Sequence, residues 1–107
     1  MRHAIATVLV LGFVFAAPLA RAEDPNAQEG RGLAEANCAT CHSLEAEGAS
    51  PFADAPPFRD VAKRYTESEL MDGFMEGLPV RHEAMPDWNM TEDQAIALSL
   101  FIMTLAK

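Results

Sequence analysis

The sequence predicts an all-α domain of three to four helices joined by long loops. Thr66 and Thr91 each stand three residues before a Glu or Gln, just ahead of an apolar stretch, which is the pattern of a helix capping box. Within both stretches the apolar residues recur at helical spacing, and no segment alternates apolar and polar residues as a half-buried strand does. A chain of 107 residues holds one such domain at most.

The first part of the chain has the pattern of a secretory signal peptide. A short basic start precedes an apolar run over residues 4–17, and small residues follow it. We expect cleavage before Glu23, so that residues 1–22 are the signal and residues 23–107 the domain. The alternative is an uncleaved anchor, but the run is shorter than the roughly 18–20 apolar residues that a membrane span needs.

The charge balance is strongly acidic, with 16 acidic and 8 basic residues. Residues 23–107 keep 6 of the basic residues and all 16 acidic ones, which gives a formal charge of −10. This balance excludes nucleic-acid binding through a basic face. An apolar fraction of 50% excludes a disordered chain. A domain this small commonly needs a metal, a cofactor or disulfides to stabilise it.

The first helix is expected over residues 26–38, with Asn26 as its N-cap and Leu33 on its apolar side. Gly30 and Gly32 would each destabilise this helix by about 1 kcal/mol. Such glycines are explained if a close packing partner leaves no room for a side chain.

Gly and Pro residues and the two capping boxes define the remaining elements. In chain order they are a loop over 43–57, a short helix over 58–63, a helix opened by Thr66 and ended by Gly77 and Pro79, a loop over 79–90, and a helix over 91–106. Loops this long are unusual in so small a domain, and they favour a fold whose loops wrap a cofactor.

The run Cys38-Ala39-Thr40-Cys41-His42 is a C-x-x-C-H motif, which is typical of covalent haem attachment. Two thiols at this spacing lie on one side of a helical turn, so each can add to one of two neighbouring vinyl groups. The imidazole of His42 is then a good axial ligand for the iron. We therefore expect one covalent haem c, which is attached outside the cytoplasm, in agreement with an export signal.

Other interpretations of the cysteines fit less well. A thioredoxin-like redox pair belongs beside a βαβ pattern, which this sequence lacks. A zinc site built from the two cysteines, His42 and His82 would need much closer spacing of its histidines. A disulfide between Cys38 and Cys41 would be strained, and it would leave His42 without a role.

Met85 is the expected sixth ligand of the iron. It lies in a loop, and Pro86 keeps it out of helical geometry, so its sulfur can extend towards the iron. His82 is the alternative, and bis-histidine ligation would lower the reduction potential. The other methionines of the domain occupy positions that favour packing: Met71, Met75, Met90 and Met103.

Three stretches resemble class I cytochromes c, especially the small exported bacterial ones. They are GRGLAEANCATCH at 30–42, APPF at 55–58 and HEAMP at 82–86. The resemblance covers about residues 26–107 and implies the cytochrome c fold, whose long loops wrap one covalently bound haem. It further implies that the first and last helices cross closely, with Gly30 against Phe101.

The resemblance also implies that the Pro56 carbonyl accepts a hydrogen bond from the axial His42. The family's usual aromatic residue in the first helix is Ala34 here, and its Gly-Pro pair is Ala55-Pro56. Trp88 is expected either in the apolar wall around the haem or as a donor to a haem propionate. Further candidates for that wall are Phe52, Phe58, Phe74 and Leu78.

The resemblance implies a periplasmic one-electron carrier and not an enzyme, with no catalytic residues and no membrane span after processing. Its partners would be redox proteins, and the acidic charge predicts that they carry a basic docking patch. Two alternatives are an electron-outlet subunit of a periplasmic dehydrogenase or oxidase, and a ligand-binding or catalytic haem protein with an open sixth position.

Overall fold

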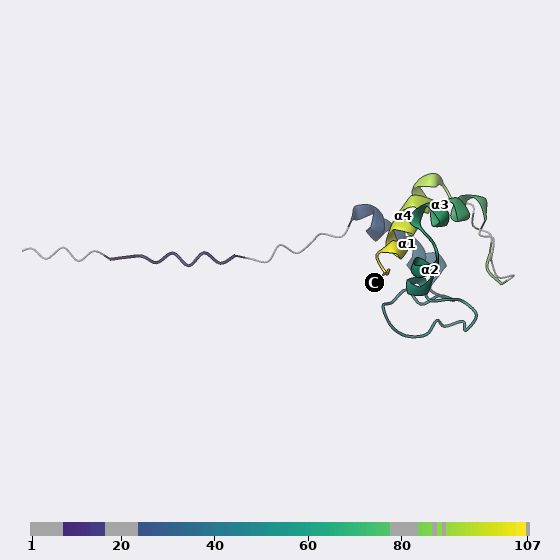
Figure 1. Ribbon diagram of the computed structural model, residues 1–107, viewed down its shortest axis with the longest axis horizontal. Helices are drawn as coiled ribbons and strands as arrows, with labels where there is room; N and C mark the ends of the chain where they lie inside the picture. The colour runs from purple at the N-terminus through teal and green to yellow at the C-terminus, as the bar shows by residue number, and fades with distance from the viewer. Residues whose placement is uncertain (1–7, 17–23, 78–83, 87, 89, 107) are drawn as a thin grey trace, which may run out of the picture.

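The chain forms a small bundle of helices, here described from a computed structural model over residues 8–16, 24–77, 84–86, 88 and 90–106. The helices are α1 (Pro25–Asn37), α2 (Phe58–Arg64), α3 (Glu67–Glu76) and α4 (Glu92–Met103), and the described residues contain no strand (Figure 1). The all-α expectation is confirmed.

Residues 8–16 are exposed, contain no helix and stand clear of the helical domain (Figure 1). Across the described part of the chain, no helix combines the length and the apolar character that a membrane crossing requires. The expected cleavage point before Glu23 lies outside the described residues.

Helix α1 begins one residue earlier than predicted. The Asp24 side chain accepts a hydrogen bond from the backbone N–H of Asn26 at 2.9 Å, and Pro25 occupies the first turn. The expectation that Asn26 caps this helix is therefore wrong. Proline suits the first helical position because its fixed φ matches the helix and its missing N–H would have no partner there.

Helices α1 and α4 cross at Gly30, as the resemblance implied. A methyl group at Gly30 would collide with the carbonyl group of Ala97 and lie 2.9 Å from the Cβ atom of Phe101. Gly32 is exposed, and a methyl group there would meet no atom within 4 Å. Close approach to α4 therefore explains Gly30 but not Gly32.

Both predicted capping boxes are present. Thr66 exchanges hydrogen bonds of 2.7 and 3.2 Å with Glu69, and Thr91 exchanges bonds of 3.1 and 3.2 Å with Gln94. Gly77 ends α3 with a φ of +105°, a backbone conformation that favours glycine. Helix α4 ends at Met103, earlier than the predicted residue 106.

Helix α4 is the centre of the core and packs against α1 and α3, with α2 nearby (Figure 1). The buried cluster consists of Ala34, Leu44, Phe58, Ala62, Leu70, Leu98, Phe101 and Ile102. These residues come from all four helices and from the loop that follows α1. That loop turns widely beneath α2 before the chain returns to it (Figure 1).

Candidate cofactor site

The two cysteines lie on a turn at the end of α1. The backbone N–H of Cys38 donates to Ala34 O at 2.7 Å, and the N–H groups of Cys41 and His42 donate to Cys38 O at 3.2 and 2.9 Å. Both thiols are free; Cys38 is half-buried and Cys41 exposed. Burial, with a smaller contribution from the neighbouring Cys41, raises the pKa of the Cys38 thiol to about 11.

The His42 ring is held between two residues at the start of α2. Its Nδ1 atom lies 2.7 Å from Pro56 O, and its centroid lies 5.0 Å from the Phe58 ring at an interplanar angle of 43°. Because a carbonyl oxygen can only accept, Nδ1 must carry the hydrogen. The lone pair is then on Nε2, which is the form of the ring that binds a metal.

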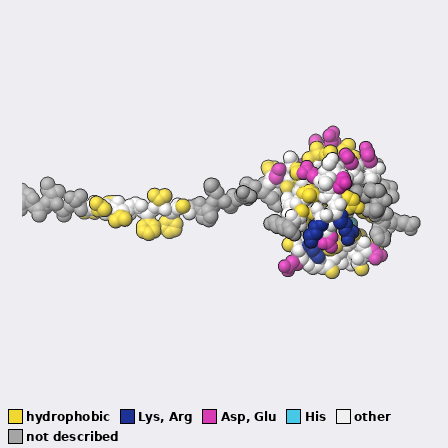
Figure 2. Space-filling view, in the orientation of Figure 1, with side chains coloured by type: hydrophobic (Ala, Val, Ile, Leu, Met, Phe, Trp, Pro, Cys, Tyr) yellow, Lys and Arg dark blue, Asp and Glu magenta, His cyan; other side chains and the backbone are white. Residues whose placement is uncertain are grey.

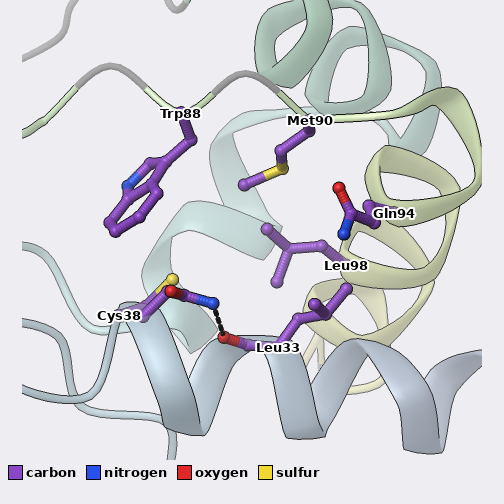
Figure 3. Close-up of a pocket in the computed structure, with 7 residues that line it drawn as sticks. Leu33, Cys38, Trp88, Met90, Gln94 and Leu98 are labelled. Atoms are coloured by element: carbon purple, nitrogen blue, oxygen red, sulfur yellow. Dashed lines mark hydrogen bonds between the residues drawn. The ribbon is translucent and has the colours of Figure 1, made fainter.

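A cavity of about 210 Å³ lies beside Cys38, between the end of α1 and the start of α4. Its lining consists of Leu33, Asn37, Cys38, Trp88, Met90, Gln94 and Leu98. In Figure 3 the Trp88 ring and the Met90 thioether approach the cavity from the same segment, across from Cys38 and Leu33. The dashed line in Figure 3 marks the hydrogen bond that Asn37 Nδ2 donates to Leu33 O at 2.9 Å.

The sequence model of the cytochrome c family matches residues 27–106 of this chain. This protein belongs to the cytochrome c family. The comparisons with curated proteins and with solved structures found no match. Members of the family bind haem c covalently and carry electrons, so the expected cofactor, fold class and general role are confirmed for this cytochrome c.

The residues of this cytochrome c fit such a group. Free thiols stand at the C-x-x-C-H spacing, and the imidazole that follows them has its Nδ1 occupied and its Nε2 available. Beside Cys38 lies a cavity whose lining combines apolar side chains with the polar Asn37 and Gln94 and includes neither Cys41 nor His42. The Met90 side chain, on the wall of this cavity, packs against the core cluster. Two thiols for covalent attachment, an imidazole for the iron and a thioether on the cavity wall are groups that a c-type haem uses.

The structure brings together some of the predicted site residues and not others. Cys38 and Trp88 line one cavity, and Trp88 remains 38% exposed. Met85 is half-buried and is not part of that lining. The alternative ligand, His82, lies outside the described residues, as does Leu78 of the proposed haem wall.

The other proposed wall residues differ in burial. Phe58 is buried against His42, Phe74 is half-buried, and Phe52 is 40% exposed. The sequence assigned Met90 to packing before the last helix and did not place it beside the cavity that contains Cys38. Its position two residues after Trp88, on the same short segment, was the available signal.

Proposed function

We propose that this cytochrome c is an exported, periplasmic one-electron carrier with its haem attached to Cys38 and Cys41 and its iron bound by His42 and Met85. The observation that carries this proposal is the 2.7 Å contact between His42 Nδ1 and Pro56 O, which leaves Nε2 available on the residue directly after Cys41. When bound, haem c supplies an iron that takes up and releases a single electron.

His42 is prepared for this role by its neighbours. The Pro56 carbonyl fixes the tautomer of the imidazole and increases its basicity, which favours ferric iron. The Phe58 ring packs beside the imidazole and shields it from water. Both contacts limit rotation of the ring and so restrict the direction of its Nε2 lone pair.

Met85 is the proposed sixth ligand. Pro86 disfavours a helical backbone at Met85, which lies at a bend of the chain and is half-buried. Met90 packs against the core and borders the cavity, which is the position of a wall residue. A soft thioether ligand would favour ferrous iron and raise the reduction potential.

Three single variants test the ligand assignment: Met85→Ala, Met90→Ala and His82→Ala. We expect Met85→Ala to abolish the methionine–iron charge-transfer band at the red end of the ferric spectrum and to lower the potential. The other two variants should keep the band. Loss of the band in Met90→Ala with its retention in Met85→Ala would show that Met90 is the ligand.

The absence of that band from the unaltered protein would contradict His/Met ligation altogether. A bis-histidine protein would then keep a low-spin spectrum that His82→Ala removes. A protein with an open sixth position would instead bind carbon monoxide readily, which would favour the ligand-binding or catalytic alternative.

The start of α1 supports the proposed cleavage before Glu23. In the described stretch that starts at residue 24, Asp24 already contacts the helix by capping it. Cleavage at this point would leave the cap intact and would remove residues 8–16, which make no contact with the core cluster. Periplasmic export follows from the signal pattern and from the need to attach haem c outside the cytoplasm.

Many of the acidic side chains of the domain are gathered on one face, although others lie among the basic ones and form the ion pairs Arg31–Glu35 and Lys63–Asp60. Acidic side chains gather over α3 and the start of α4, whereas basic ones gather over α2 (Figure 2). The acidic face consists of Glu67, Glu69, Asp72, Glu76, Glu92 and Asp93. We propose that this face attracts redox partners that present a basic patch, because opposite charges steer encounter.

A further inference from the structure

Arg59 connects α2 to the loop that follows the C-x-x-C-H motif. Its Nη1 atom donates to Glu45 O at 3.3 Å and its Nη2 atom to Gly48 O at 2.7 Å. Gly48 has a φ of +95°, so the loop turns sharply at this point. Hydrogen bonds from a charged donor are about twice as strong as neutral ones, and here two of them hold one short turn.

The Arg59 hydrogen bonds are part of a ring of contacts that includes His42. From Glu45 the chain runs back three residues to His42, and from Arg59 it runs back three residues to Pro56. His42 and Pro56 are joined by the 2.7 Å contact between His42 Nδ1 and Pro56 O, which completes the ring. Between them, the N–H of Phe58 donates to Ser43 O at 2.9 Å.

We propose that Arg59 is a positioning residue for His42. By holding residues 45–48 against the first turn of α2, its guanidinium keeps the Pro56 carbonyl on the Nδ1–H group of His42. This inference rests on the proposed role of His42 as iron ligand. Among the hydrogen bonds of the described residues, Arg59 donates none to the imidazole and none to the proposed haem-binding residues.

Lysine cannot replace the fork that Arg59 makes. An ammonium group is a compact charge at the end of a flexible stem, and it lacks the planar set of donors that reaches two carbonyls at once. Arg59→Lys therefore breaks the paired hydrogen bonds to Glu45 O and Gly48 O without removing the positive charge. Arg64, on the last turn of the same helix, is exposed and offers the matched position for removing charge without touching the loop.

Losing the two Arg59 hydrogen bonds and losing a positive charge should shift the reduction potential in opposite directions. Weakening the Pro56–His42 bond makes the imidazole less basic and disfavours ferric iron, so the potential should rise. Removing a positive charge favours ferric iron by simple electrostatics, so the potential should fall. A variant that loses only the hydrogen bonds and a variant that loses only the charge should therefore shift the reduction potential with opposite signs.

The experiment uses the haem-loaded protein and compares Arg59→Lys with Arg64→Gln and Thr66→Ala. Thr66→Ala breaks a capping box distant from the loop and controls for a general loss of stability. For each protein we would measure the reduction potential and, by NMR of the ferrous form, the hydrogen-exchange rate of His42 Nδ1–H.

We expect Arg59→Lys to raise the potential and to speed exchange at His42 Nδ1 about tenfold, because lysine can keep at most one of the two hydrogen bonds that Arg59 makes. Arg64→Gln should lower the potential slightly without changing exchange, and Thr66→Ala should change neither. An Arg59→Lys protein identical to the unaltered one in both measurements would overturn the inference, as would equal acceleration in Thr66→Ala.

The spectrum of the unaltered protein distinguishes a failure of the proposed function from a failure of the role of Arg59. A spectrum without histidine-ligated low-spin iron would remove the proposed function, and the role of Arg59 with it. A normal spectrum together with an unaffected Arg59→Lys variant would remove the role of Arg59 alone.

Discussion

Gly30 of α1 lies against the backbone carbonyl of Ala97 in α4, so close that a single methyl group on Gly30 would collide with it. Glycine costs a helix about 1 kcal/mol relative to alanine. The close crossing offsets this cost because it buries Ala34, Leu98 and Phe101 around the same contact. The contact between the first and last helices therefore depends on a missing side chain.

Alanine in place of Gly30 and alanine in place of Gly32 should change the stability of the protein in opposite directions. Gly30→Ala should destabilise the protein by about 1–3 kcal/mol, because the new methyl group meets backbone that cannot move aside easily. Gly32→Ala, the matched control on the same helix, should stabilise by up to about 1 kcal/mol, because its methyl group enters open space. Denaturant unfolding followed by circular dichroism measures both; equal effects would contradict the packing account.

Local sequence signals predicted most of the fold. Both capping boxes and the glycine that ends α3 occur where the sequence placed them, because each depends on residues within four positions of one another. The cap of α1 was misassigned to Asn26 because both Asp24 and Asn26 can cap. The proline between them, suited to the first helical turn, was the deciding signal.

Beyond the C-x-x-C-H motif, less of the candidate site could be predicted from the sequence. The C-x-x-C-H pattern predicts the attachment residues because its chemistry lies within five consecutive positions. The bridge from Arg59 to residues 45–48 and the place of Met90 beside the cavity depend on contacts between distant segments. No spacing rule encodes such contacts, so the structure was needed to find them.

Two substitutions at Trp88 separate its two proposed roles. If the indole acts as an apolar wall, Trp88→Phe should keep the potential and stability near those of the unaltered protein, whereas Trp88→Ala should destabilise it by about 1–3 kcal/mol. If the indole N–H bonds a propionate, both variants should shift the potential. We expect the wall behaviour, because the side chain lines the cavity, and redox titration with denaturant unfolding measures it.

The acidic face should control association with redox partners. Stopped-flow electron transfer from its reductase should slow about tenfold or more as salt is raised, because screening removes electrostatic steering. The double variant Asp72→Asn with Glu76→Gln should weaken this salt dependence. Glu47→Gln, which removes an exposed charge outside the acidic face, should have little effect. A rate independent of ionic strength would contradict docking through this face.

The covalent haem is tested most directly by the mass of the exported protein and of its tryptic fragments. Expressed with residues 1–22 in cells that mature c-type haem, the polypeptide should have the mass of residues 23–107 plus one haem, iron included. Digestion should place the added mass on the fragment spanning 32–59, which contains both cysteines. A folded, colourless product with the mass of the bare polypeptide would contradict the account.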